Sequence, residues 1–150
     1  MNIFITKKIN IIKVAKIISL VYYLFLIYVL FFHFLRTTKY NTVNLTPFFT
    51  IIRYFKYYDI FTFKFWFLNI FGNIILFIPF GFLMPLTRNK PTHVIKILVI
   101  TTLLCFIFEL CQFIFKVGQF DIDDIILNTL GSFIGFLLVN FCKKKAYQGK

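Results

Sequence analysis

The chain has 150 residues, of which 60% are hydrophobic and 22% aromatic. Soluble domains are roughly 45–50% apolar, and a soluble protein of this size cannot bury so many apolar side chains. The net charge is +12, but the basic residues flank apolar runs instead of forming one dense patch. The composition therefore excludes a soluble domain, favours topology signals over nucleic-acid binding, and predicts one domain over residues 1–150 in a lipid bilayer.

Four apolar stretches follow one another along the chain. They cover residues 17–35, 65–86, 97–115 and 125–142. Each is close to the roughly 20 residues that a helix needs to cross the bilayer core. The sequence therefore predicts an all-α integral membrane bundle of about four transmembrane helices.

The Lys and Arg residues are distributed unevenly between the two predicted sides of the membrane. More of them lie in the N-terminal tail, in the short loop between the second and third stretches, and in the C-terminal tail. Since basic residues accumulate on the cytoplasmic side, both termini are predicted to be cytoplasmic. The predicted location is the cell membrane, with several passes.

The first outer loop, residues 37–64, has a helical pattern of its own. Thr46 and Pro47 are typical of an N-cap and a first helical residue. Arg53 and Lys56 lie among apolar residues at helical spacing, namely Phe48, Ile51, Ile52 and Phe55. This pattern predicts an amphipathic helix on the outer membrane surface.

Polar side chains gather in the outer third of the predicted helices. Four of the five acidic residues fall in one short part of the chain, as Glu109, Asp121, Asp123 and Asp124. With a rise of about 1.5 Å per residue, several amides reach a depth similar to that of Glu109. These amides are Asn69, Asn73, Gln112 and Asn128. We expect these polar groups from three helices to meet and to form a functional or ligand-binding cluster.

The residue types leave several roles open for this cluster. The amides either join helices by hydrogen bonds or face a ligand. Asp121 or Asp123 either caps the last helix or serves with Glu109 in acid–base chemistry. Glu109, Asp121 and Asp124 are also candidate ligands of a hard cation such as Mg²⁺ or Ca²⁺, and the cofactor stays unknown. An ionised Glu109 would need a partner, for which His33, Arg36 and Lys116 are at a similar level.

Small residues and prolines mark the predicted structural positions. Gly131 and Gly135 form a GxxxG pattern, which permits close helix approach. Pro79 and Gly81 are expected to bend the second helix, because proline cannot donate to the carbonyl one turn before it. Pro47 and Gly72 complete this structural set.

Together these residues resemble the VanZ-like membrane protein family. The resemblance runs from residue 44 to 135 and includes Asn44-Leu45-Thr46-Pro47-Phe48 with Thr50-Ile51, Gly72-Asn73 with Pro79-Phe80-Gly81 and Pro85, Glu109-x-x-Gln112, and Phe120-Asp121-Ile122-Asp123-Asp124 with Asn128, Gly131 and Gly135. Many members have an arginine just before the acidic segment, where this chain has Gly118-Gln119.

The resemblance implies a cell-envelope protein associated with resistance to teicoplanin-type glycopeptide antibiotics, and it implies no mechanism. We therefore expect the outer polar and acidic pocket to bind a lipid-linked or amphiphilic envelope molecule. A membrane-embedded enzyme that uses a metal or carboxylates on a lipid-linked substrate is the alternative. An ion path through the buried acids is a third.

Overall fold

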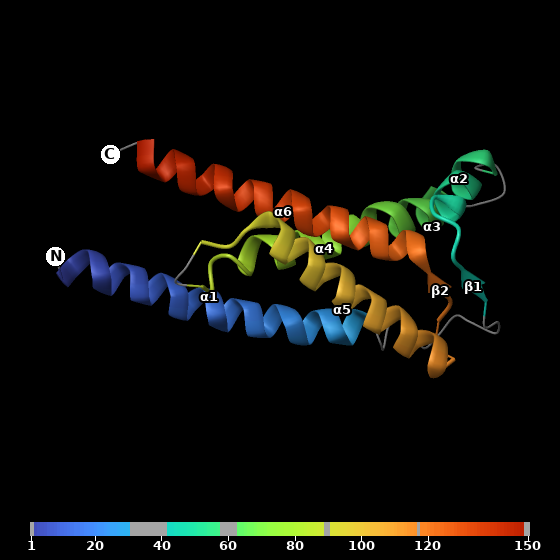
Figure 1. Cartoon of the computed structure of the whole chain (residues 1–150), viewed down its shortest axis with the longest axis horizontal. Helices are drawn as coiled ribbons and strands as arrows, with labels where there is room; N and C mark the ends of the chain where they lie inside the picture. Colours follow the sequence, from blue (N-terminus) through green and yellow to red (C-terminus); the bar gives the residue numbers. More distant parts are fainter. Residues whose placement is uncertain (1, 31–41, 58–62, 89–90, 117, 149–150) are drawn as a thin grey trace.

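The computed structural model describes residues 2–30, 42–57, 63–88, 91–116 and 118–148, with side-chain surroundings given from residue 12 to residue 145 within these ranges. The described part is an elongated bundle of helices (Figure 1). Both termini lie at one end of the bundle, and a small two-stranded sheet with helix α2 lies at the other end. We call this second end the distal end.

Among the described residues, three helical segments are long and apolar enough to cross a membrane. The first, Phe63–Leu83, consists of α3 (Phe63–Phe67), a π-helical segment (Leu68–Gly72) and α4 (Asn73–Leu83). The others are α5 (Val94–Ile114) and the part Ile122–Lys145 of α6 (Ile122–Gln148). The prediction of an all-α membrane bundle is confirmed, with helix ends shifted by a few residues from the predicted ones.

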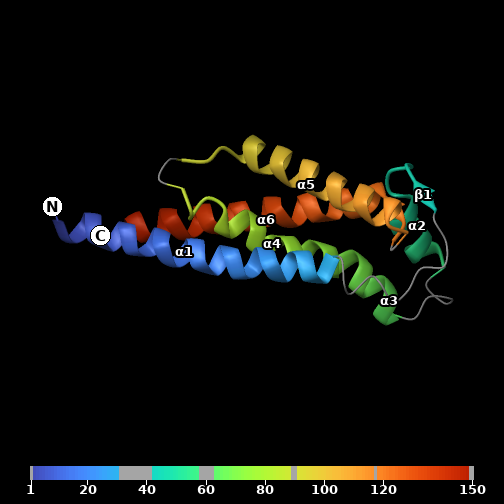
Figure 2. The same cartoon turned by 90° about the horizontal axis from the view of Figure 1, so that it is seen from below.

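Helix α1 (Asn2–Tyr28) contains the start of the first predicted stretch, whose last residues lie outside the described part of the chain. It packs on α4, where the Tyr22 hydroxyl donates to the Leu76 carbonyl at 2.7 Å and the ring centroids of Tyr23 and Phe80 are 5.7 Å apart. In Figure 2, α5 lies above the α6 ribbon and α1 below it, and Gln112 of α5 donates to the carbonyl of Leu30, just after α1, at 2.8 Å. A count of four spans and cytoplasmic termini stay predictions.

Helices α4 and α6 touch along their backbones. A Cβ atom at Gly81 would overlap the Ser132 carbonyl oxygen, and a Cβ atom at Gly131 would overlap the Ile74 carbonyl oxygen. Gly135 lies equally close to the carbonyl oxygen of Ile78. We call this contact the glycine seam. It requires residues without a side chain, because even a methyl group has no room between the two backbones.

Helix α5 packs on α6 through a layer of polar and apolar side chains next to the glycine seam. The fully buried Thr101 hydroxyl donates to the Ile97 carbonyl at 2.9 Å and is hydrogen-bonded to the Ser132 hydroxyl at 3.0 Å. The buried side chains of Phe77 and Cys105 fill the surrounding core. Helix α4 continues through Pro79 without a break.

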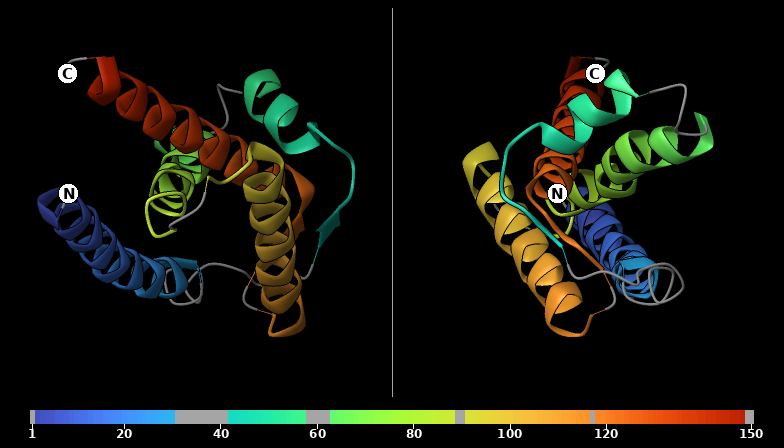
Figure 3. Two further views of the ribbon diagram at one scale, coloured as in Figure 1. Left: turned by 60° about the vertical axis from the view of Figure 1, so that its left-hand side comes forward. Right: turned by 90° about the vertical axis from the view of Figure 1, so that its right-hand side faces the viewer.

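A short parallel sheet joins the distal loops. Strand β1 (Val43–Asn44) pairs with β2 (Phe120–Asp121), and Asn44 is the register partner of Asp121. Figure 3 shows the two strands side by side, with α2 (Phe49–Lys56) following β1. The pairing therefore brings the loop after α1 to the first turn of α6, more than 70 residues later in the chain.

The predicted start of the interfacial helix was wrong. Helix α2 begins at Phe49, because the Phe49 amide donates to the Thr46 carbonyl at 3.2 Å and closes a turn around Pro47 and Phe48. Phe48 has φ 64° and ψ 4°, as the third residue of a type II turn requires. No side chain next to it caps α2. The helix itself exists, as predicted, but its cap comes from elsewhere in the fold.

Candidate functional site

Asp123 supplies the cap of α2 from the first turn of α6. Its carboxylate is fully buried and accepts hydrogen bonds from the backbone amides of Phe48, of Thr50 at 2.8 Å and of Ile51 at 3.2 Å. The first amides of a helix have no partner within that helix, and a negative charge there is also favoured by the helix dipole. One side chain of α6 thus fixes the position of α2.

Asp121 completes this connection from the residue before α6. One carboxylate oxygen accepts from the Thr50 hydroxyl at 2.6 Å, and the other accepts from the Asn44 side-chain amide at 2.9 Å. The second oxygen also accepts from the Asp123 backbone amide at 2.9 Å, which makes Asp121 the N-cap of α6. We call these four side chains, Asn44, Thr50, Asp121 and Asp123, the clasp.

Two more acids lie directly beneath the clasp. Glu109 of α5 is 5% exposed and accepts from the Asp121 backbone amide at 3.0 Å. Asp124 accepts from the side-chain amide of Asn73 on α4 at 2.6 Å. The acidic group thus links β2 to α5 and α6 to α4, so each acid of this group receives a hydrogen bond from the protein.

Other predicted cluster members face different partners. The Asn69 side chain donates to the Phe65 carbonyl of its own helix at 2.8 Å, and Gln112 donates to the Leu30 carbonyl at 2.8 Å. Asn128 is 4% exposed, and its side-chain oxygen has no hydrogen-bond partner among the described residues. The structure therefore links Asn73 directly to an acid of the cluster, Asp124. Asn69 and Gln112 instead donate to backbone carbonyls outside the cluster, and the Asn128 side-chain oxygen has no partner among the described residues.

The residues predicted to pair with Glu109 or to bind a metal ion form neither an ion pair nor a metal site in the described part of the structure. His33 and Arg36 lie outside the described residues, and Lys116 is exposed beyond the end of α5. Within the described ranges, no three His, Cys, Asp or Glu side chains are arranged to hold a metal ion. Gly72, predicted beside the cluster, faces open space, because no described atom outside its own helix lies within 4 Å of the place that a Cβ would take.

Helix α2 divides into an inner and an outer face. Tyr54 lies on the inner face, where burial and then the nearby Asp124 and Asp121 carboxylates raise its pKa above the ordinary value of 10.0. The outer face carries Phe49, Arg53 and Tyr57, each four residues after the last. The clasp therefore determines which face of α2 is presented at the surface of the distal end.

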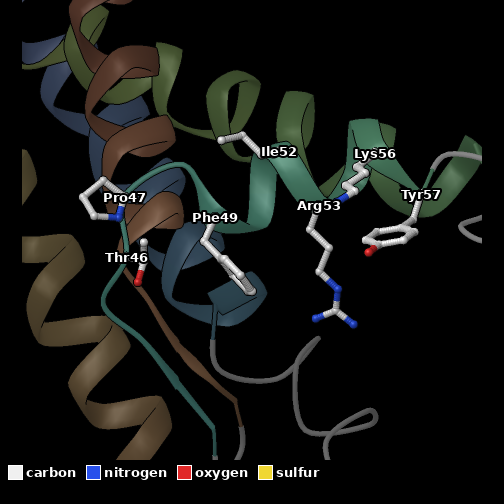
Figure 4. A pocket seen from close by; sticks show the side chains of 7 residues that line it. All are labelled: Thr46, Pro47, Phe49, Ile52, Arg53, Lys56 and Tyr57. Carbon is white, nitrogen blue, oxygen red and sulfur yellow. The ribbon is translucent and has the colours of Figure 1, made fainter.

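Two hollows lie over the outer face of α2. The larger, of about 640 Å³, is shown in Figure 4 and is lined by Thr46, Pro47, Phe49, Ile52, Arg53, Lys56 and Tyr57. The smaller, of about 440 Å³, reaches from Arg53 and Phe49 to Asn44 and Asp121 of the sheet and to Gln119, which precedes β2. Arg53 thus lines the same hollow as Gln119, which precedes the acidic segment.

The sequence did not indicate several residues of this end as functional. Asn44 and Thr50 belong to the clasp, and Phe49 and Tyr57 line the larger hollow. Asn44 stands in the segment that carries the family resemblance, which was an available signal. Thr50 belongs to the same resemblance through Thr50-Ile51, whereas Tyr57 had no signal beyond its place in the loop.

These features define a class of protein: a helical membrane protein whose distal loops are fixed to a membrane-spanning helix by the carboxylates of Asp121 and Asp123. A family model described as VanZ/LLP1 matches residues 19–143, so the chain belongs to this family. It is also 38% identical over 78 residues to a protein of Enterococcus faecium named Protein VanZ. That match covers 52% of this chain and 48% of the relative, so the chain matches about half of the relative's length. No solved structure matches the chain.

Proposed function

We propose that this chain contributes to teicoplanin-type glycopeptide resistance by binding a cell-envelope ligand at its distal end. The observation that carries the proposal is the coupling of the clasp to the two hollows. Asp121 both lines the smaller hollow and receives the hydrogen bonds of Asn44 and Thr50. A site whose lining is fixed by partly buried hydrogen bonds loses little entropy when a ligand binds.

Membership of the VanZ/LLP1 family and the similarity to Protein VanZ support the resistance role. The composition supports a ligand anchored in the membrane, because the hollows lie at the end of three apolar spans. In this proposal the acids act mainly on the shape of the site. They hold α2 and β1, and the ligand meets the surface that these elements present.

Teicoplanin susceptibility of a sensitive Gram-positive host tests the proposal. The wild type is expected to raise the inhibitory threshold, and Asp121→Ala is expected to return it to that of the host at matched membrane levels. Asn140→Ala changes an exposed polar residue near the other end of α6 and should keep the wild-type threshold.

Two results would contradict the proposal in different ways. A wild type that leaves the threshold unchanged removes the resistance role. Full resistance in Asp121→Ala removes the distal end as its site. The alternative enzyme stays a prediction, which requires turnover of a lipid-linked substrate by the purified protein.

A further inference from the structure

We propose that the larger hollow on α2 binds a phosphate group carried by a lipid, with Arg53 and Lys56 holding the phosphate. This inference names the ligand class for the site and so rests on the proposed function above. Four observations lead to it: the chemistry of the lining, the order of side chains along α2, the apolar surface beside them, and the rigid placement of the helix.

The lining of the larger hollow combines two cations with hydroxyl and apolar groups. No Asp or Glu is among its described residues, although Asp121 lines the smaller hollow next to it. The planar Arg53 guanidinium suits two phosphate oxygens at once, and Lys56 adds a second positive charge. Thr46 and Tyr57 supply hydroxyl donors. The volume of about 640 Å³ is in the range of small-molecule sites.

The side chains of the outer face are ordered along the helix. In Figure 4 the Phe49 and Tyr57 rings lie on either side of the Arg53 side chain, which extends away from the helix. The Lys56 ammonium lies 5.6 Å from the centroid of the Tyr57 ring. The two charges are therefore bordered by aromatic surface, and an anion that reaches them also contacts apolar groups.

Exposed apolar residues continue from the cations along α2. Phe49 is 51% exposed and Ile52 is 60% exposed, and both line the hollow. Amphipathic helices with this composition lie at the boundary between head groups and acyl chains. A ligand at this level that satisfies both halves of the site carries an anionic head and a hydrocarbon chain. Free inorganic anions and acidic peptides satisfy only the cationic half.

The clasp keeps this arrangement in place without the ligand. A helix of eight residues is marginal on its own, because the first turn is costly to form. Asp123 satisfies the first amides of α2, and the inner-face Thr50 is bonded to Asp121. The cations are thus held on a fixed helix, which distinguishes a site from a diffuse basic surface.

Trp66 lies next to α2 and serves as a fluorescent probe of its surroundings. It is the single tryptophan of the chain, and its ring lies 5.9 Å from the Phe55 ring of α2. The test reconstitutes the whole chain in phosphatidylcholine vesicles that contain small amounts of brominated lipid, and it measures quenching of Trp66. Brominated phosphatidylglycerol is compared with brominated phosphatidylcholine and with brominated oleate, which carries a carboxylate in place of a phosphate.

The wild type is expected to prefer brominated phosphatidylglycerol over brominated phosphatidylcholine by roughly 30-fold, which corresponds to about 1 kcal/mol for each of the two basic residues near the head group. The double variant Arg53→Ala/Lys56→Ala should lower this preference to about one. Arg53→Lys should retain part of it, since it keeps the charge and loses the paired donors. Lys64→Ala is the matched control, because Lys64 lies near Trp66 on α3 and does not line the hollow.

Three results would overturn the inference: no preference in the wild type, an unchanged preference in the double variant, or an equal loss in Lys64→Ala. Equal quenching by brominated oleate would overturn the assignment to phosphate. An unchanged Trp66 emission maximum in pure phosphatidylcholine controls for folding of each variant. If the lipid preference behaves as expected and teicoplanin susceptibility does not change, the resistance proposal fails and the phosphate site stands.

Discussion

The glycine seam and the clasp both hold α6, and they do so by opposite means. In the seam, carbonyl oxygens of one helix occupy the space that a side chain of the other would need, so close packing requires that the glycines have no side chain. In the clasp, carboxylate oxygens of Asp121 and Asp123 occupy places that only an acceptor can fill. The seam therefore responds to added volume and the clasp to a lost oxygen. This difference separates variants of the whole fold from variants of the distal surface.

The largest effect is expected at the seam. Gly81→Ala places a methyl group on the Ser132 carbonyl, and the contact is backbone on both sides, so neither partner can move without separating α4 from α6. We expect a loss of about 3 kcal/mol in the free energy of unfolding. Thermal unfolding in detergent, followed by circular dichroism, measures it.

Gly72→Ala is the matched control for this variant, because no described atom outside its own helix lies within 4 Å of the added carbon. It should be neutral or slightly stabilising, since alanine favours a helix more than glycine does. Equal losses in the two variants would mean that the glycines act through backbone flexibility and would remove the steric account of the seam.

A smaller and more local effect is expected at the clasp. Asp123→Ala removes the acceptor of three backbone amides at the start of α2. Hydrogen exchange at Thr50 and Ile51 should accelerate by roughly 30-fold, which corresponds to about 2 kcal/mol of local opening. The midpoint of global unfolding should change little, because the seam stays intact. Accelerated exchange across the middle of α6 would show that the two regions are one cooperative unit.

The same contrast explains how far the sequence alone could lead. The apolar stretches predicted three spans that the structure describes, because each depends on its own composition. The depth of the polar residues suggested that Asn73 and Asp124 belong to one layer, and they share a hydrogen bond. The cap of α2 was assigned to Thr46 because local spacing was the available signal. The true cap, Asp123, is reached only through the pairing of β1 with β2.

The outer face of α2 escaped prediction for a related reason. Arg53 and Lys56 were recognised as the polar side of an amphipathic helix, but the helix had no fixed orientation until its inner face was known. Thr50 and Tyr54 define that face through contacts with residues of α6 and β2. Periodicity gives the two sides of a helix, and tertiary contacts decide which of them lines a site.

The smallest expected effect is a pH dependence of the clasp that originates at Tyr54. Burial first, and then the Asp124 and Asp121 carboxylates, raise the pKa of this phenol above 10.0 in the folded protein. When α2 detaches, the phenol returns to its ordinary pKa, so the detached state releases the proton at a lower pH than the closed state. The contribution of Tyr54 to the closed clasp is therefore constant below pH 10 and is lost progressively as the pH rises above it.

Trp66 emission follows this opening, because Phe55 leaves the tryptophan ring when α2 moves. We expect the wild type to show an alkaline change in emission that Tyr54→Phe lacks in the same pH range. Tyr57→Phe, on the outer face of the same helix, should behave as the wild type does. Lysine deprotonation affects all three proteins equally and cancels in the comparison. An alkaline change in emission that persists in Tyr54→Phe would show that deprotonation on the inner face of α2 does not cause the opening.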